Sequence, residues 1–188
     1  MMATTHVFAG LVLAAIVALI APQFAAVAAF AAILGGLFPD LDVVADHRKT
    51  LHYPVYYSAL AVPTLLIAVV VPGPATVALA VFVLAAAGHS VADCVGGSHE
   101  LKPWQAGSNR AVYSHYHGQW LEPRRWIGYD GSPGDLALSA VLAVPALFVF
   151  DGTVQVLVVG MLVVSIAYAT LRRPVAAGVD WLVRRENQ

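Results

Sequence analysis

The first 39 residues of this chain contain no lysine, arginine, aspartate or glutamate, and two carboxylates, Asp40 and Asp42, follow almost at once. An uncharged apolar run of this length is about twice the roughly 20 residues that one membrane-spanning helix needs. Pro22 lies near its middle and divides it into two expected spans. No basic residue precedes the first span, so we expect it to be retained and not cleaved as a secretion signal. The two acids then lie where the second span meets water.

The rest of the chain repeats this alternation of apolar runs and polar turns. Hydrophobic residues make up 60% of the sequence and charged residues only 11%, which is outside the range of a water-soluble globular domain. We therefore predict an all-α fold, a single integral membrane domain over residues 1–188 with about six transmembrane helices. The expected spans are residues 3–21, 22–38, 54–71, 75–95, 135–150 and 153–171, with polar loops at 39–53 and 96–134 and a basic tail at 172–188.

The distribution of cations predicts the topology of these spans. Cytoplasmic loops of membrane proteins are enriched in lysine and arginine, and all 10 cations of this sequence fall in the two long loops and the tail. We therefore expect a multi-pass protein of the plasma or inner membrane with both termini and both long loops in the cytoplasm. The net charge of -1 excludes the basic face that a nucleic acid would need. Membrane lipid is the expected partner, and the oligomeric state is left open.

Six ionisable side chains fall at the cytoplasmic ends of four expected spans. Charged groups beside hydrocarbon are costly unless they are paired, and imidazole with carboxylate is a ligand set for zinc or manganese. We predict a site for one or two divalent metal ions, zinc being favoured and manganese the alternative. The predicted ligands, one to two from each helix end, are His6, Asp40, Asp42, His52, His89 and Asp93.

A metal site of this kind activates water and can hold a phosphoryl group. We expect catalytic roles for Asp42, His52 and Arg48, the last as a planar, permanently charged ligand of a phosphate oxygen. Structural interpretations stay open, such as a topology anchor for Arg48 or a helix-ending turn for Asp40 and Asp42. The sequence leaves four loop histidines without a role: His47, His99, His115 and His117.

Four short motifs, in this order, resemble the family of predicted membrane-bound metal-dependent hydrolases. The resemblance covers about the first 100 residues and implies a small multi-span inner-membrane protein. The motifs of that family are similar to those of zinc-dependent phospholipase C, which implies a phosphoester substrate and ligand roles for the same six positions. The matching segments are Thr5-His6, Pro39-Asp40-Leu41-Asp42, His47-Arg48 to Thr50-Leu51-His52, and Gly88-His89 with Asp93.

Two classes of function are compatible with this sequence. One is a hydrolase at the cytoplasmic leaflet that acts on a phosphoester such as a lipid head group. The alternative is a non-catalytic membrane protein, either a metal-ion carrier or a scaffold with a structural His/Asp cluster. A carrier should place polar residues along a path across the bilayer. Between Leu136 and Leu171 only Asp151 carries a charge, which favours the hydrolase.

Overall fold

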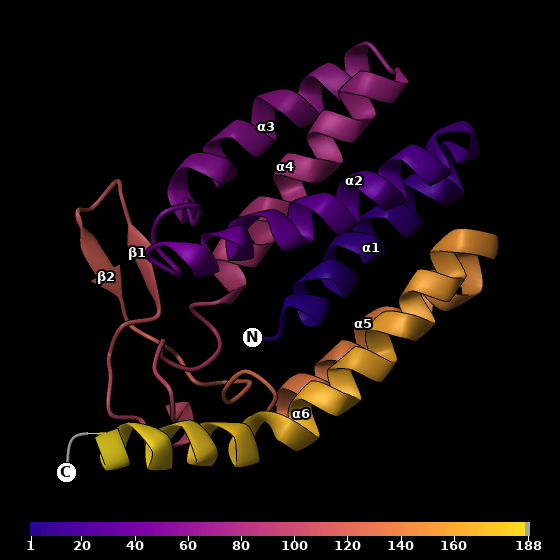
Figure 1. Ribbon diagram of the computed structural model, residues 1–188. Coiled ribbons are helices and arrows are strands. Elements are labelled where there is room, and N and C mark those ends of the chain that lie inside the picture. Colours follow the sequence, from indigo (N-terminus) through magenta and orange to yellow (C-terminus); the bar gives the residue numbers. More distant parts are fainter. Residues whose placement is uncertain (187–188) are drawn as a thin grey trace.

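The computed structural model describes residues 1–186 and is mainly helical (Figure 1). Helix α1 lies between two layers, because it packs against α2 and α4 on one side and against α5 on the other. Helix α3 covers α4, and α6 covers α5. The helices are α1 (Ala3–Ile20), α2 (Ala25–Leu37), α3 (Pro54–Val70), α4 (Pro74–Ala92), α5 (Pro133–Val149) and α6 (Gly152–Glu186).

A helix occupies each of the six apolar ranges, so the prediction of a helical fold is confirmed. Within residues 1–186, four helical segments are long and apolar enough to cross a membrane: Ala3–Ile20, Pro22–Val44, Pro74–Ala92 and Gly152–Arg185. The second of these joins α2 to the 3-10 helices that flank it, Pro22–Phe24 and Phe38–Val44. Helices α3 and α5 are also apolar but have only 17 residues each.

Small residues let the central helices approach closely. Ala14 of α1 and Ala28 and Ala32 of α2 are fully buried in the same apolar core as Phe8 and Leu11. Small side chains let the backbones of apolar helices come into close van der Waals contact. The alanine- and glycine-rich sequence of α1 and α2 therefore accounts for their tight pairing.

Gly35 marks the closest approach of α2 to α4. A Cβ atom at this position would lie 2.3 Å from the carbonyl oxygen of Phe82 and 2.9 Å from its Cα. Backbone atoms cannot rotate away, so we expect Gly35→Ala to lower the free energy of unfolding by about 1–3 kcal/mol. Thermal unfolding in detergent measures the effect. Gly160→Ala, where a Cβ meets nothing within 4 Å, is the matched control, and equal melting temperatures of the two variants would contradict the prediction.

The last helix departs from the predicted layout. Helix α6 does not end near residue 171 but continues through Pro174 to Glu186, and Figure 1 shows it bending on the way. The predicted basic tail of residues 172–188 is therefore an extension of α6, with residues 187–188 outside the part of the chain described. Asp180 in this extension accepts a hydrogen bond from Lys102 at 2.6 Å, which ties the end of α6 to the long loop.

The loop predicted over residues 96–134 contains a small antiparallel hairpin. Strand β1 (Val112–Ser114) pairs with β2 (Gln119–Leu121), with Tyr113 opposite Trp120. Two strands of three residues give too weak a periodic pattern to be recognised in a sequence. The hairpin lies beside the segment that precedes α3 (Figure 1).

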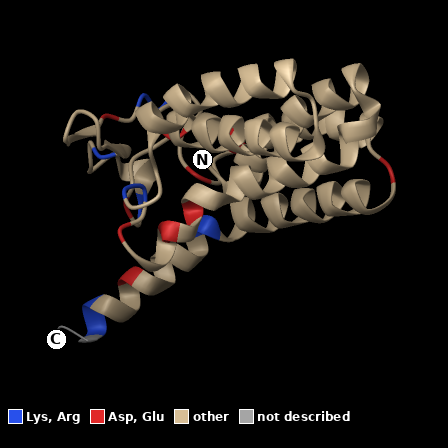
Figure 2. Cartoon of the chain, turned by 90° about the horizontal axis from the view of Figure 1, so that it is seen from above, with Lys and Arg blue, Asp and Glu red and all other residues tan. Residues whose placement is uncertain are grey.

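Charged residues gather at one end of the bundle (Figure 2). The lysine and arginine residues lie in the loops and along the end of α6. The turn between α5 and α6 at the opposite end carries an acid, Asp151. The start of α1 and the end of α2 lie at the charged end (Figure 1). The helix ends that carry the predicted ligands are therefore brought to the same end of the molecule.

Candidate metal centre

Four of the six predicted ligands converge at the charged end. Asp40, His52, His89 and Asp93 each offer one ligand atom, and these four atoms lie within 4.8 Å of one another. They come from the 3-10 helix after α2, from the segment before α3, and from the last turn and the end of α4. Asp40 is partly exposed and the other three are buried. We call these four residues the metal cluster.

The two imidazoles of the metal cluster face its two carboxylates. His89 Nε2 lies 3.3 Å from Asp40 Oδ1 and 3.6 Å from Asp93 Oδ2. His52 Nε2 lies 3.4 Å from Asp93 Oδ2 and 3.8 Å from Asp40 Oδ1. The four atoms thus surround a single point, and neither Nε2 atom has a hydrogen-bond partner among the described residues.

The other nitrogen of each ring fixes the orientation. His89 Nδ1 lies 2.7 Å from the carbonyl oxygen of Gly36, and His52 Nδ1 lies 2.9 Å from Asp42 Oδ2. A carbonyl and an ionised carboxylate only accept hydrogen bonds, so Nδ1 carries the proton of each neutral ring and Nε2 presents a lone pair. Two lone pairs and two carboxylate oxygens then face one another in a buried place, which is costly without a cation between them. A divalent ion there would accept both lone pairs and leave both rings neutral.

Asp42 lies beside the metal cluster and organises the loop that follows it. Arg48 has a left-handed backbone with φ of 61°, which lets successive amides turn toward one carboxylate. A carboxylate that fixes the Nδ1 of a metal-binding histidine is a common arrangement in metalloproteins, and the structure places Asp42 in that position. The carboxylate of Asp42 accepts five hydrogen bonds. The donors are His47 Nδ1 at 2.8 Å, Arg48 N at 3.3 Å, Lys49 N at 3.3 Å, Leu51 N at 3.1 Å and His52 Nδ1 at 2.9 Å.

His6 approaches the metal cluster from α1. Its Nε2 lies 2.9 Å from Asp93 Oδ1, and its ring stacks on that of His89 with centroids 3.7 Å apart. The amino group of Met1 donates to the same Asp93 oxygen at 2.6 Å. These contacts turn the other oxygen of Asp93, Oδ2, toward the two imidazoles. His6 is thus placed to position Asp93 and His89.

Arg48 is buried between the metal cluster and the long loop. Its Nη1 donates to the carbonyl of Gly97 at 2.9 Å, and its Nε lies 3.4 Å from Asp93 Oδ2. The second contact is an ion pair without the alignment of a hydrogen bond, since Nε has no hydrogen-bond partner. The guanidinium therefore offsets part of the negative charge of Asp93. It also forms part of the walls of two cavities beside the metal cluster.

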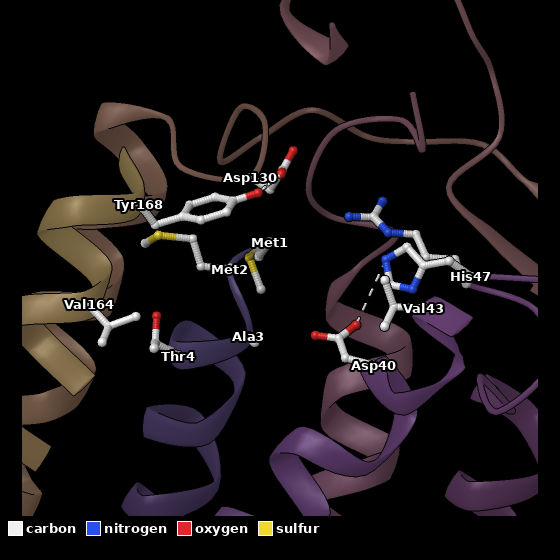
Figure 3. Close-up of a pocket in the computed structure, with 11 residues that line it drawn as sticks. Met1, Met2, Ala3, Thr4, Asp40, Val43, His47, Asp130, Val164 and Tyr168 are labelled. Atoms are coloured by element: carbon white, nitrogen blue, oxygen red, sulfur yellow. Dashed lines mark hydrogen bonds and ion pairs between the residues drawn. The ribbon is translucent and has the colours of Figure 1, made fainter. Parts of the chain in front are cut away.

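One cavity reaches the metal cluster, and a second lies beside it. The first has a volume of about 330 Å³, and Asp40 lies in its wall (Figure 3). The second has a volume of about 280 Å³ and is lined largely by polar residues of the long loop, His99 among them. His47 and Arg48 line both. Burial lowers the pKa of His99, and the neighbouring His47 and Arg48 lower it further, so this imidazole is held neutral.

The remaining loop histidines hold the hairpin in place. His115 Nε2 donates to the carbonyl of Lys49 at 2.7 Å, and its ring stacks on Tyr53. His117 Nδ1 lies 2.8 Å from the hydroxyl of Ser114 within the hairpin. Neither belongs to the metal cluster. The contacts of His115 attach the hairpin to the loop that wraps Asp42, and the contact of His117 closes the turn of the hairpin itself.

Asp135 is a buried acid whose contacts the sequence gives no reason to expect. It accepts hydrogen bonds from Met2 N at 2.7 Å, from Thr5 Oγ1 at 2.8 Å and from Gly131 N at 3.1 Å. These bonds anchor the start of α1 to the start of α5 and so fix the position of His6. Two of the partners lie 133 and 130 residues away in the chain, a distance over which no local spacing gives a signal.

Comparison of the chain with protein-family models, with curated proteins and with solved structures finds no match. The functional argument therefore depends on the geometry of the metal cluster and of the cavities beside it.

Proposed function

We propose that this protein is a membrane-embedded, metal-dependent hydrolase that acts on a phosphoester at the cytoplasmic end of its helical bundle. One observation carries the proposal: four metal-ligand atoms converge without a hydrogen bond to satisfy either Nε2, and they do so at the wall of an open cavity. A structural cluster would gain nothing from such a cavity. The resemblance of the sequence motifs to membrane-bound metal-dependent hydrolases points to the same activity.

The membrane arrangement completes this proposal. All six helices cross the bilayer in this proposal. Helices α3 and α5 have only 17 residues each, but they are apolar enough to be included. The charged end lies in the cytoplasm because it carries the lysine and arginine residues (Figure 2). Both termini then lie on the cytoplasmic side of the plasma or inner membrane, and the metal cluster lies at the depth of the lipid head groups.

Zinc is the metal that we propose for this cluster, with manganese as the alternative. Zinc bonds of about 2.0–2.2 Å in a tetrahedron place neighbouring ligand atoms about 3.3–3.6 Å apart. The four imidazole-to-carboxylate separations here run from 3.3 to 3.8 Å. Four ligand atoms around one point suit a single ion.

A divalent ion held there would supply a Lewis acid that activates water and polarises the phosphoester. The side chains around it hold the geometry. Asp42 fixes the ring of His52, and His6 fixes the carboxylate of Asp93. Arg48 places a positive charge in the walls of both cavities, which favours an anionic substrate.

A metal-ion carrier is less compatible with this arrangement. Immediately below the metal cluster the bundle is filled by fully buried apolar side chains such as Phe8, Leu11 and Ala32. An ion moving to the opposite end would have to pass this core, where no oxygen or nitrogen ligand of these side chains is available. The position of the cluster at one end suits a reaction site.

Purified protein tests the proposal when metal content and turnover are measured together. We expect about one zinc or manganese ion per chain by elemental analysis, and metal-dependent hydrolysis of bis(para-nitrophenyl) phosphate or of phosphatidic acid in detergent. A chelator should abolish turnover and added metal should restore it, while Asp40→Asn should stay inactive. A chain that binds metal but turns over neither substrate would be a carrier or a scaffold, and a chain without metal would exclude the site itself.

A further inference from the structure

The first cavity has two chemically different sides (Figure 3). One side carries Asp40 of the metal cluster together with His47 and Arg48, and Val43 of the 3-10 helix lies beside them. The opposite side is mainly apolar and is formed by the first residues of the chain and by Val164 of α6, with Asp130 held at the hydroxyl of Tyr168. A cavity with these two sides is suited to an amphiphile and not to a small polar ester.

Tyr168 of α6 stands at the boundary between the two sides. Its hydroxyl donates to Asp130 Oδ2 at 2.5 Å, and Arg172 Nε donates to the same oxygen at 2.8 Å. The ring of Tyr168 therefore has a fixed orientation, with its polar tip toward the loop and its apolar body toward Val164 (Figure 3). Tyrosine is suited to such a boundary because one end is apolar and the other polar.

The apolar side continues as a groove along the outside of α6. This groove has a volume of about 460 Å³ and shares Val164 and Tyr168 with the first cavity. Leu171 and Val175, which also line it, are 55% and 58% exposed. Only 17% of the most apolar stretch of α6 is buried inside the protein. In a bilayer the exposed side chains of residues 153–171, such as Val164, therefore face lipid hydrocarbon, while Val175 lies at the charged end beyond Arg172 and Arg173.

We propose that the substrate is a membrane phospholipid that enters sideways past α6, with a hydrocarbon chain in the groove and its phosphate at the metal cluster. This proposal rests on the proposed hydrolase function and names its substrate class and route of access. A chain can pass from the bilayer into the groove at little cost because both are apolar. Hydrolysis breaks one P–O bond of the head group: water supplies a hydroxyl to phosphorus and a proton to the departing oxygen.

Blocking the apolar side tests the route. Val164→Trp fills the junction between the groove and the first cavity, and Val43→Trp fills the cavity from its opposite wall. Val163→Trp is the matched control, because Val163 is the neighbouring residue on α6, is 62% exposed and lines neither space. Circular dichroism, gel filtration and metal content establish that each variant is folded. If Val164→Trp does not fold, Val43→Trp takes its place.

The first readout is binding, measured with phosphatidic acid that carries a photoactivatable diazirine on its acyl chain in lipid nanodiscs. We expect labelled peptides from residues 1–4 and 164–168, and at least a fivefold loss of that labelling in Val164→Trp or Val43→Trp. Val163→Trp should stay within twofold of the wild type. Labelling that is unchanged by both blocking variants would overturn the proposal.

The second readout is turnover of two lipids with the same head group, dioleoyl phosphatidic acid in nanodiscs and water-soluble dibutyryl phosphatidic acid. We expect the blocking variants to lose at least tenfold in kcat/KM for the dioleoyl lipid and less than twofold for the soluble one, whose butyryl chains are too short to need the groove. Equal losses for both lipids would overturn the route. Cavity labelling without turnover of either lipid by the wild type would preserve the groove and refute the hydrolase function.

Discussion

Replacing His89 by alanine is expected to remove the bound metal. His89 is buried, its Nδ1 is held by the carbonyl of Gly36, and its Nε2 lies 3.3 Å and 3.6 Å from the two carboxylates of the metal cluster. Removing a partner outside the ligand set already lowers metal affinity by about 10- to 100-fold. Losing a ligand together with its lone pair should therefore cost more than about 100-fold.

Elemental analysis after gel filtration and competition with a chelator measure this loss. His117→Ala is the matched control, since His117 is exposed and contacts only its own hairpin. That variant should keep the metal content and affinity of the wild type. Retention of stoichiometric metal by folded His89→Ala protein would show that His89 is not a ligand and that the metal does not bind at the metal cluster as proposed.

Replacing Asp42 by asparagine is expected to weaken the site without removing it. The carboxylate accepts five hydrogen bonds, one from each of two imidazoles and three from backbone amides. An asparagine has the same shape, but its NH2 group donates and cannot accept. The oxygen that this group replaces therefore leaves either His47 or His52, and the backbone amides that share that oxygen, without a partner. We expect metal affinity to fall by about 10- to 100-fold, and the free energy of unfolding to fall by about 1–3 kcal/mol.

A metal titration that includes saturating concentrations separates this role from that of a ligand. Asp42→Asn should still bind one ion per chain when metal is in excess, because the four atoms of the metal cluster remain. Asp46→Asn is the control in the same loop, since the Asp46 side chain is 69% exposed and pairs only with Lys49. A loss of metal as complete as in His89→Ala would make Asp42 a ligand, as the sequence alone predicts.

The sequence predicted the helices because their signal is local. An apolar run of about 20 residues between turns specifies a helix whatever the rest of the chain does, as an isolated helix satisfies its own backbone in lipid. The same reasoning had no access to the small hairpin over 112–121 or to the continuation of α6 past Pro174. The strands of the hairpin are too short to give a periodic pattern, and the extension of α6 is held by contacts between distant segments, such as the bond from Lys102 to Asp180.

The candidate site was likewise predicted in part by the sequence, and the rest required the structure. Residue type and membrane side were enough to select the six ionisable groups, and the helix period was enough to bring His89 and Asp93 onto one face. These arguments place side chains at a common depth, but they say nothing about which atoms face one another. The structure separates the four residues that converge from Asp42 and His6, which contact them from outside.

What the sequence by itself determined is a helical chain with its cations, its histidines and all of its aspartates except Asp151 at one end, because hydrophobic length and charge placement act locally. Only the tertiary structure decided the roles within that end. The left-handed turn at Arg48 directs the loop amides and two imidazoles to Asp42, and the backbone carbonyl of Gly36, invisible in any side-chain pattern, fixes His89. Orientation of this kind depends on hydrogen bonds between residues far apart in the chain, 53 positions for Gly36 and His89 and 87 for His6 and Asp93, which arise only when the helices pack.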